Sequence, residues 1–278
     1  MHDIQSDLCR SHRIHWLSAL PLLLLTGLLA TASVRAETYY LAVPPFMDRE
    51  QGETQFTELA RYLSDKTGED VQIRASANPI AFWESLKRGD FDLVLDGPHL
   101  ADYRVQRLDH HVIAKVKGLL SFTLVMRPDN AVFEADELIG QKVAITPAPS
   151  LCAVQIEGFY PNIMRRPELI EVSSHEVALL KLRSGEVDAA FIPTPLTAQN
   201  PDLVLVAQSE QVPHSAMTAG PRVPARMQRQ IRAALVGAQN DQDGARVLEV
   251  MNVYSGFENA SDEMYASYSN MLTGIWAY

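Results

Sequence analysis

Short apolar runs rich in β-branched residues alternate with stretches of helical periodicity along almost all of this 278-residue chain after its first 36 residues. Residues 38–43 predict a strand, and apolar side chains at helical spacing over 56–63 predict a helix. A second strand is predicted over 71–75, and Asn78 followed by Pro79 is typical of the start of a second helix. This alternation predicts an α/β fold.

A helix–turn–strand unit occurs twice in the chain. Residues 86–93 read Leu-Lys-Arg-Gly-Asp-Phe-Asp-Leu, and residues 182–189 read Leu-Arg-Ser-Gly-Glu-Val-Asp-Ala. In each copy a glycine can adopt the left-handed conformation that ends a helix, and the apolar strand after it runs to a proline, at 97–98 and at 193–195. One copy in each half of the chain predicts two similar lobes.

Two extended runs, 119–126 and 215–219, lack the preceding helix of a βαβ unit, and we interpret them as crossings between the lobes. The first lobe would then comprise residues 37–121 and 219–278, and the second lobe residues 122–218. The alternative is a single doubly wound domain, which would need an unusually long sheet.

The N-terminus has the layout of a secretory signal peptide. Arg10 and Arg13 precede an apolar run from Trp16 to Ala30, and small or β-branched residues stand at Val34 and Ala36, the two positions where a signal peptidase accepts short side chains. We predict cleavage after Ala36 and localisation in the periplasm. An uncleaved membrane anchor is the alternative, because the apolar run is almost long enough to span a bilayer.

Charge and cysteine content narrow the function classes. The first 36 residues hold three of the 24 basic and two of the 34 acidic side chains, so the remainder carries a net charge of −11 with neutral histidines. Such a surface is a poor partner for nucleic acid. Cys152 is the only cysteine after the signal peptide, so an internal disulfide is excluded and stability must come from core packing.

Several short segments together resemble the phosphate, phosphite and phosphonate binding proteins of ABC importers. The matching segments, which span nearly all of the chain after the signal peptide, are 63–68, 89–92 with 97–98, 138–144, 174–178, 185–190 and 223–225. The resemblance implies a two-lobed type 2 periplasmic-binding fold, often called a Venus flytrap, with two chain crossings between the lobes. It also implies a solute-binding protein. We expect that the chain is not an enzyme and uses no cofactor.

The function that we expect is capture of a small, phosphate- or phosphonate-like anion between the two lobes, followed by delivery to the membrane permease of an ABC importer. The alternative partner is a membrane sensor kinase, for which the chain would be an accessory ligand-sensing protein. We expect the chain to be a monomer.

In open α/β sheets, ligands bind at the carboxyl ends of the strands, where helix N-termini also present free N–H groups. Six segments of the chain meet this condition: 44–46, 76–78, 97–99, 146–152, 173–175 and 193–194. From them we predict these ligand-binding residues: Phe46, Asn78, Pro98, His99, Thr146, Ser150, Ser174, His175 and Thr194.

The resemblance implies that His175, in the run Ser174-His175-Glu176, donates to the bound oxyanion. For the hydroxyl residues at helix starts, capping of the helix is the alternative to ligand contact. A solvent-facing histidine without a role is the alternative for His175.

The chain departs from the family at two places. Phosphonate binders commonly have a Ser-Thr-Ser-like run where this chain has Ser150-Leu151-Cys152, and Ala101 stands where an aromatic phenol is expected. These departures are compatible with a larger, less charged or different anion, or with a site adapted for sensing.

A catalytic alternative depends on Cys152 and His175. Cys152 lies at a predicted helix N-terminus, where the pKa of a thiol falls, so a Cys–His nucleophile pair is conceivable. No surrounding catalytic motif supports such a pair, and a lone cysteine is commonly a packed apolar residue. No metal site is predicted either, because the adjacent His110 and His111 would point to opposite faces of a strand.

Overall fold

The computed structural model describes residues 37–275. The predicted signal peptide and its cleavage site therefore lie outside the described residues. No helix within 37–275 has both the length and the apolar character needed to cross a membrane.

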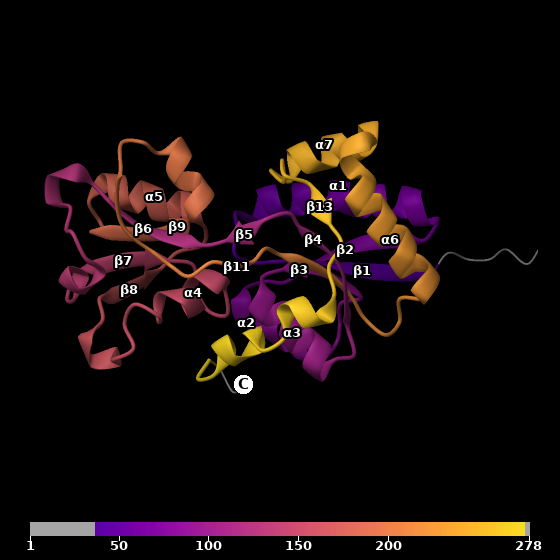
Figure 1. The fold of residues 1–278 in the computed structure, drawn as a ribbon, viewed down its shortest axis with the longest axis horizontal. Helices are drawn as coiled ribbons and strands as arrows, with labels where there is room; N and C mark the ends of the chain where they lie inside the picture. The colour runs from indigo at the N-terminus through magenta and orange to yellow at the C-terminus, as the bar shows by residue number, and fades with distance from the viewer. Residues whose placement is uncertain (1–36, 276–278) are drawn as a thin grey trace, which may run out of the picture. The chain divides into compact units, whose positions relative to one another are not determined.

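Two separate mixed sheets form the framework of the described chain (Figure 1). The first sheet has the order β13-β4-β12-β3-β1-β2, with β1 (Thr38–Val43), β2 (Asp70–Ala75), β3 (Leu93–Asp96), β4 (His111–Val116), β12 (Ala216–Ala219) and β13 (Phe257–Glu258). The second has the order β10-β6-β9-β7-β8, with β6 (Phe122–Met126), β7 (Lys142–Ile145), β8 (Glu168–Glu171), β9 (Ala189–Pro193) and β10 (Val204–Gln208). This arrangement confirms the two-lobed α/β prediction and excludes a single sheet.

Both sheets use the same local pattern. In the first sheet β1 lies parallel to β2 and β3, and in the second β7 lies parallel to β8 and β9. Each sheet also contains one strand that follows a crossing and runs antiparallel to its neighbour. In the first sheet β12 pairs with β3, and in the second β6 pairs with β9. The carboxyl ends of the parallel strands are the edges at which a ligand site is expected.

The crossings are shorter than the sequence predicted. Among the strands of residues 37–275, β5 (Leu119–Leu120) and β11 (Val212–Pro213) lie between the sheets, where they pair antiparallel with each other (Figure 1). Residues 122–126 already belong to the second sheet, and residues 216–219 to the first.

Seven α-helices of the described chain surround the sheets: α1 (Arg49–Thr67), α2 (Pro79–Lys87), α3 (Pro98–Arg107), α4 (Leu151–Ile156), α5 (His175–Ser184), α6 (Ala225–Gly237) and α7 (Gln242–Val250). Their ends agree with the local sequence signals. Asn78 caps α2 ahead of Pro79, and α1 ends at Gly68 in the left-handed conformation with φ 76°.

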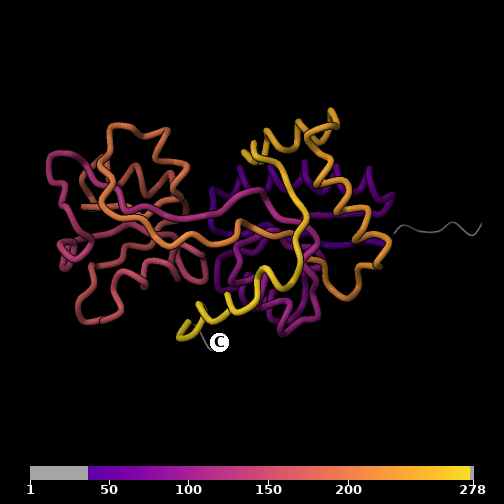
Figure 2. Tube along the Cα trace, viewed as in Figure 1, coloured from indigo at the N-terminus to yellow at the C-terminus, as the bar shows by residue number. Residues whose placement is uncertain are grey.

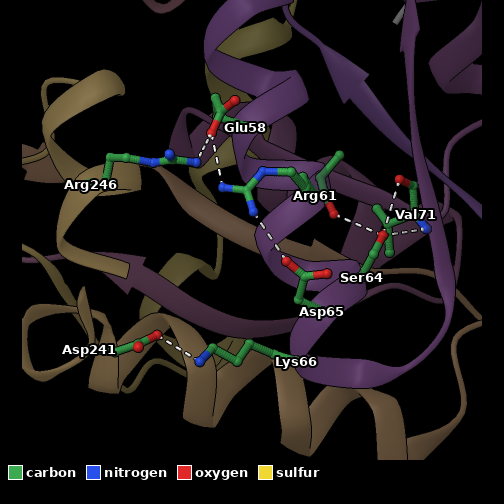
Figure 3. Close-up of polar contacts among 9 residues, drawn as sticks. Glu58, Arg61, Ser64, Asp65, Lys66, Val71, Asp241 and Arg246 are labelled. Atoms are coloured by element: carbon green, nitrogen blue, oxygen red, sulfur yellow. Dashed lines mark hydrogen bonds and ion pairs between the residues drawn. The ribbon is translucent and has the colours of Figure 1, made fainter. Parts of the chain in front are cut away.

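The C-terminal helices α6 and α7 pack on α1, which anchors them to the first sheet. Figure 3 shows the polar contacts of α1: the Glu58 carboxylate accepts from Arg61 (3.1 Å) and Arg246 (2.7 Å), and Lys66 pairs with Asp241 (2.7 Å). Such exposed pairs contribute only about 0–1 kcal/mol each. The packing depends instead on the apolar side chains buried between α1, α6 and α7.

The last described residues reach both lobes. Two 3₁₀ helices, Asp262–Tyr265 and Tyr268–Leu272, pass along α3, and the second also contacts α4 (Figure 2). Leu272 and Ile275 belong to a buried apolar cluster that contains Trp83 from the first lobe and Phe191 from the second. The two lobes are therefore in contact through a continuous apolar core.

Candidate functional site

A cavity of about 290 Å³ lies between the two sheets. From the first lobe it is lined by the loop after β1, the end of β3 and the start of α3. From the second lobe it is lined by the loop after β7, α4, the start of α5 and the end of β9. The crossings line it through Leu120, His214 and Ser215. Most lining side chains are apolar and a few polar groups converge among them, as in small-molecule sites generally.

The structure brings together part of the predicted site. The predicted ligand-binding residues that line this cavity are Phe46, His99, Thr146, Ser150 and His175. Asn78 lines a neighbouring pocket of about 480 Å³, which shares Pro44 and Met47 with the cavity. Pro98, Ser174 and Thr194 line neither pocket. Contact of any of these residues with a ligand stays a prediction.

Two of the residues outside the cavity cap helices. The Asn78 side-chain oxygen accepts from the backbone N–H of Ala81 at 2.8 Å, and the Ser174 hydroxyl accepts from that of Val177 at 3.4 Å. Pro98 is buried at the first position of α3, where its missing N–H costs no helical hydrogen bond. These residues therefore have local structural roles.

Thr194 is held at the first crossing. Its hydroxyl lies 2.9 Å from the hydroxyls of both Ser121 and Thr123. The same Ser121 oxygen accepts from the Gln208 amide at 2.8 Å. This network joins β6, the end of β9 and β10, so Thr194 stabilises the second lobe beside the crossing.

Thr146 and Ser150 satisfy each other within the loop after β7. The Thr146 hydroxyl donates to Ser150 Oγ at 3.0 Å, and Ser150 donates to the Thr146 carbonyl at 3.0 Å. Ser150 Oγ also accepts from the backbone N–H of Ala153 and thereby caps α4. Both hydroxyl protons are used inside the protein, so neither donates to a ligand in this arrangement.

His99 makes a hydrogen bond from one lobe to the other. Its ring is 1% exposed, and Nε2 lies 2.7 Å from the carbonyl oxygen of Pro149 in the loop before α4. Nδ1 is buried without a hydrogen-bond partner. Burial lowers the pKa of His99 to about 4, so the ring is neutral at pH 7.

His175 lies at the first position of α5 with its ring 5.8 Å from that of Phe122, centroid to centroid. Its Nδ1 is also buried without a partner. Burial lowers the pKa of His175 to about 4, with Glu176 acting in the opposite direction. A neutral His175 can donate to an oxyanion from one ring nitrogen only.

His214 is a third histidine of the cavity, and no sequence motif marks it as a site residue. Its Nδ1 accepts from the backbone N–H of Ser215 at 2.8 Å. Burial lowers its pKa to about 4, with Lys115 adding to the effect. The neutral ring therefore carries its proton on Nε2. Its position at the end of a crossing could have been a signal, because crossings pass beside the interlobe cleft.

No lysine or arginine is among the described residues that line the cavity. The nearby cations are already paired: Arg104 makes two hydrogen bonds to the Asp96 carboxylate (2.8 and 2.6 Å), and Lys115 pairs with Glu258. Asp96 itself lines the cavity. Both of these cations are therefore neutralised by carboxylates before any ligand enters.

The structure corrects the prediction about Cys152. A thiol at a helix N-terminus was expected to have a lowered pKa, whereas burial raises the pKa of Cys152 to about 12. The sulfur donates to the carbonyl oxygen of Phe191 at 3.3 Å, and the residue is 1% exposed. Loss of hydration outweighs the hydrogen bonds from Thr146, which act in the opposite direction on the pKa, so the Cys152 thiol stays protonated near pH 7. Within residues 37–275, no three His, Cys, Asp or Glu side chains converge as metal ligands.

Residues 41–265 match the family model described as the periplasmic phosphonate substrate-binding protein of ABC transporters. No curated protein gives a significant sequence match. The chain also resembles solved structures. One is PhnD1 from Prochlorococcus marinus in complex with methylphosphonate, with 15% identity, a TM-score of 0.73, and coverage of 85% of this chain and 97% of that one.

Two further solved structures have the same fold. A Xanthomonas citri protein bound to ATP has 14% identity and a TM-score of 0.69, over 87% of this chain and all of that one. A binding-protein component of a Pseudomonas aeruginosa ABC phosphonate transporter also has 14% identity and a TM-score of 0.69, over 85% of each chain. At this identity the three structures show the two-lobed fold and nothing finer.

Proposed function

Because the chain belongs to the periplasmic phosphonate substrate-binding proteins of ABC transporters, we propose that it captures a small phosphonate-like oxyanion in the cavity between its lobes and delivers it to a permease. The observation that carries this proposal is the cavity itself. It is lined from both lobes, and two buried histidine Nδ1 atoms, of His99 and His175, lack partners beside it. Buried polar atoms are almost always satisfied, so these two nitrogens are available to a ligand in the cavity, whereas the similarly unpartnered His110 Nδ1 lies outside it.

The lobe division predicted from the sequence is part of the proposal, with one adjustment. Residues 37–121 form the first lobe together with the C-terminal part, and the second lobe begins at 122. Because β12 pairs with β3 and β4, we place the return crossing before Ala216 rather than at 219. Each lobe then contains one complete sheet.

Closure of the lobes would signal to the membrane partner that a ligand is bound. A ligand that touches both walls of the cavity binds the closed state more tightly than the open state, which shifts the population towards closure. The hydrogen bond from His99 to Pro149 joins the two lobes, and opening would break it. A permease can therefore distinguish the loaded from the empty protein by lobe spacing.

We also propose that the protein has no catalytic activity, that it is exported through a cleaved signal peptide, and that it acts as a monomer. The buried, protonated thiol of Cys152 supports the first point. The family assignment favours a permease and gives no support to the sensor-kinase alternative.

Binding is tested by thermal unfolding and calorimetry of the mature chain with methylphosphonate, phosphite and phosphate. A ligand at 100 times its Kd should stabilise the protein by about 2.7 kcal/mol. His175→Ala should weaken binding about tenfold or more, because the ring lines the cavity. His111→Ala is the matched control, since this exposed histidine lies outside the cavity.

Absence of stabilisation by all three oxyanions would contradict the proposal. So would equal loss of binding in His175→Ala and His111→Ala, because the cavity would then not be the site.

A further inference from the structure

The protonation state of His99 is fixed by its partner. A carbonyl oxygen only accepts hydrogen bonds, so the contact with Pro149 O places the ring proton on Nε2. In the neutral ring Nδ1 must then be an acceptor, and this atom is buried without a donor. His99 lines the cavity, and the Gly97 backbone packs closely on its ring, because a Cβ on Gly97 would lie 3.1 Å from Nδ1 and crowd it.

The groups around His99 keep it neutral near pH 7. Asp96 and Arg104 face it from the first lobe and act in opposite directions on its pKa, and Pro149 faces it from the second lobe. Across the cavity the titratable side chains are His175, His214 and Cys152, the first two with pKa lowered and the thiol with pKa raised by burial. None of these three carries a charge at pH 7.

The cavity also contains the complementary donor. His214 accepts from Ser215 through Nδ1, so its neutral ring presents an N–H at Nε2. An acceptor on His99 and a donor on His214 suit a ligand that has both an O–H group and an unprotonated oxygen. A fully deprotonated oxyanion has no proton to offer to His99.

The charge of the cavity lining also favours a ligand with a single negative charge. No lysine or arginine lines the cavity among the described residues, and Arg104 and Lys115 are both paired with carboxylates. A doubly charged anion would therefore lose its hydration without gaining a cation, which is strongly unfavourable. A single charge can be held by neutral donors.

We propose that the protein binds its phosphonate-like ligand as the singly protonated monoanion, whose P–O–H group donates to Nδ1 of His99. This inference rests on the proposed function and makes His99 a specificity-determining residue. When the dianion is the main form in solution, binding takes up one proton from the solvent, and that proton stays on the ligand oxygen.

The first test measures the Kd of methylphosphonate from pH 7.5 to 9.5 by calorimetry. The cavity histidines are neutral throughout this range, so the pH dependence belongs to the ligand. Above the second pKa of methylphosphonate, measured in the same buffers, Kd should rise about tenfold per pH unit because the monoanion is depleted. Binding should also take up one proton, seen as a dependence of the heat on the buffer.

A flat Kd across this range overturns the inference while leaving the proposed function intact. Absence of methylphosphonate binding at every pH overturns both.

The second test uses the monomethyl ester of methylphosphonate, which keeps one negative charge but has no O–H. The wild type should bind the ester about tenfold or more weaker than the acid at pH 7, because Nδ1 stays unpaired. His99→Gln separates this effect from the size of the methyl group. Its amide nitrogen can reach the Nε2 position and keep the bond to Pro149, but no nitrogen replaces Nδ1.

In His99→Gln the ratio of the two Kd values should fall close to one. A ratio that stays at the wild-type value would show that size alone excludes the ester, and it would overturn the assignment of His99. Equal binding of acid and ester by the wild type would do the same.

Discussion

The two copies of the helix–turn–strand unit build the same structure in the two lobes. The glycine that ends each helix is left-handed, with φ 72° at Gly89 and 78° at Gly185. Three residues later an aspartate accepts from a backbone N–H of the neighbouring parallel strand: Asp92 from Tyr40 in β1 and Asp188 from Lys142 at the start of β7, both at 2.8 Å. Each unit thus fixes a central strand against its parallel neighbour.

The units differ in the segment that comes after the strand. In the first, β3 ends at Asp96, which is buried against Arg104, and α3 then brings His99 into the cavity. In the second, β9 ends at Pro193, and Thr194 begins a 3₁₀ helix held by neighbouring hydroxyls. The repeated unit therefore has a structural role. The residues that differ at the cavity come from the segment after each strand.

The largest difference should appear when the charged end of β3 is removed. Asp96→Ala would leave the Arg104 guanidinium, 1% exposed, without its carboxylate. Breaking a buried pair in this way costs about 3–5 kcal/mol. Urea unfolding of wild type and variant measures the loss.

Asp202→Ala is the matched change beside the second unit, where Asp202 pairs with Arg183 at the surface. It should cost less than about 1 kcal/mol. Similar losses in the two variants would contradict the view that burial of the Asp96–Arg104 pair causes the larger loss.

A smaller difference in stability is expected between variants of Asp92 and Asp188, the two aspartates that accept hydrogen bonds from a neighbouring strand. Asp92 is buried and also pairs with Arg222, whereas Asp188 is half-buried and has no such partner among the described contacts. Asp92→Ala should cost about 2–3 kcal/mol and Asp188→Ala about 1 kcal/mol, because an unpaired N–H costs more where water is excluded. Urea midpoints at a common m-value measure both. A larger loss in Asp188→Ala would reverse the comparison.

The repeat could be predicted from the sequence because its constraints are local. A glycine after a helix, an acid three residues later and an apolar strand determine the unit within about a dozen positions, and the cap at Asn78 with Pro79 is equally local. The two-lobed fold could be inferred from this repetition and from the family likeness.

The chemistry of the cavity could not be predicted in the same way, because it depends on contacts between distant segments. The bond from His99 to Pro149 joins positions 50 residues apart in different lobes. The direction of the Cys152 pKa shift depends on how completely the second lobe buries the thiol. His214 was missed because no motif surrounds it.

The smallest expected loss of stability concerns Gly89 and Gly185, the glycines that end the helices of the two repeated units. It tests whether the two turns are structurally equivalent. Gly89→Ala and Gly185→Ala place a Cβ on a left-handed residue, which costs about 1 kcal/mol. A Cβ on Gly89 would meet nothing within 4 Å, and one on Gly185 would touch only Arg127 at 3.8 Å, so conformation alone should set both losses. The two variants should therefore lose equal stability within about 0.5 kcal/mol. Gly237→Ala is the control: its φ of −84° suits alanine, so it should gain about 0.4–1 kcal/mol. Losses that differ by more than about 1 kcal/mol would mean that the two turns are not equivalent, and the repeat would then be a likeness of sequence without a shared structural role.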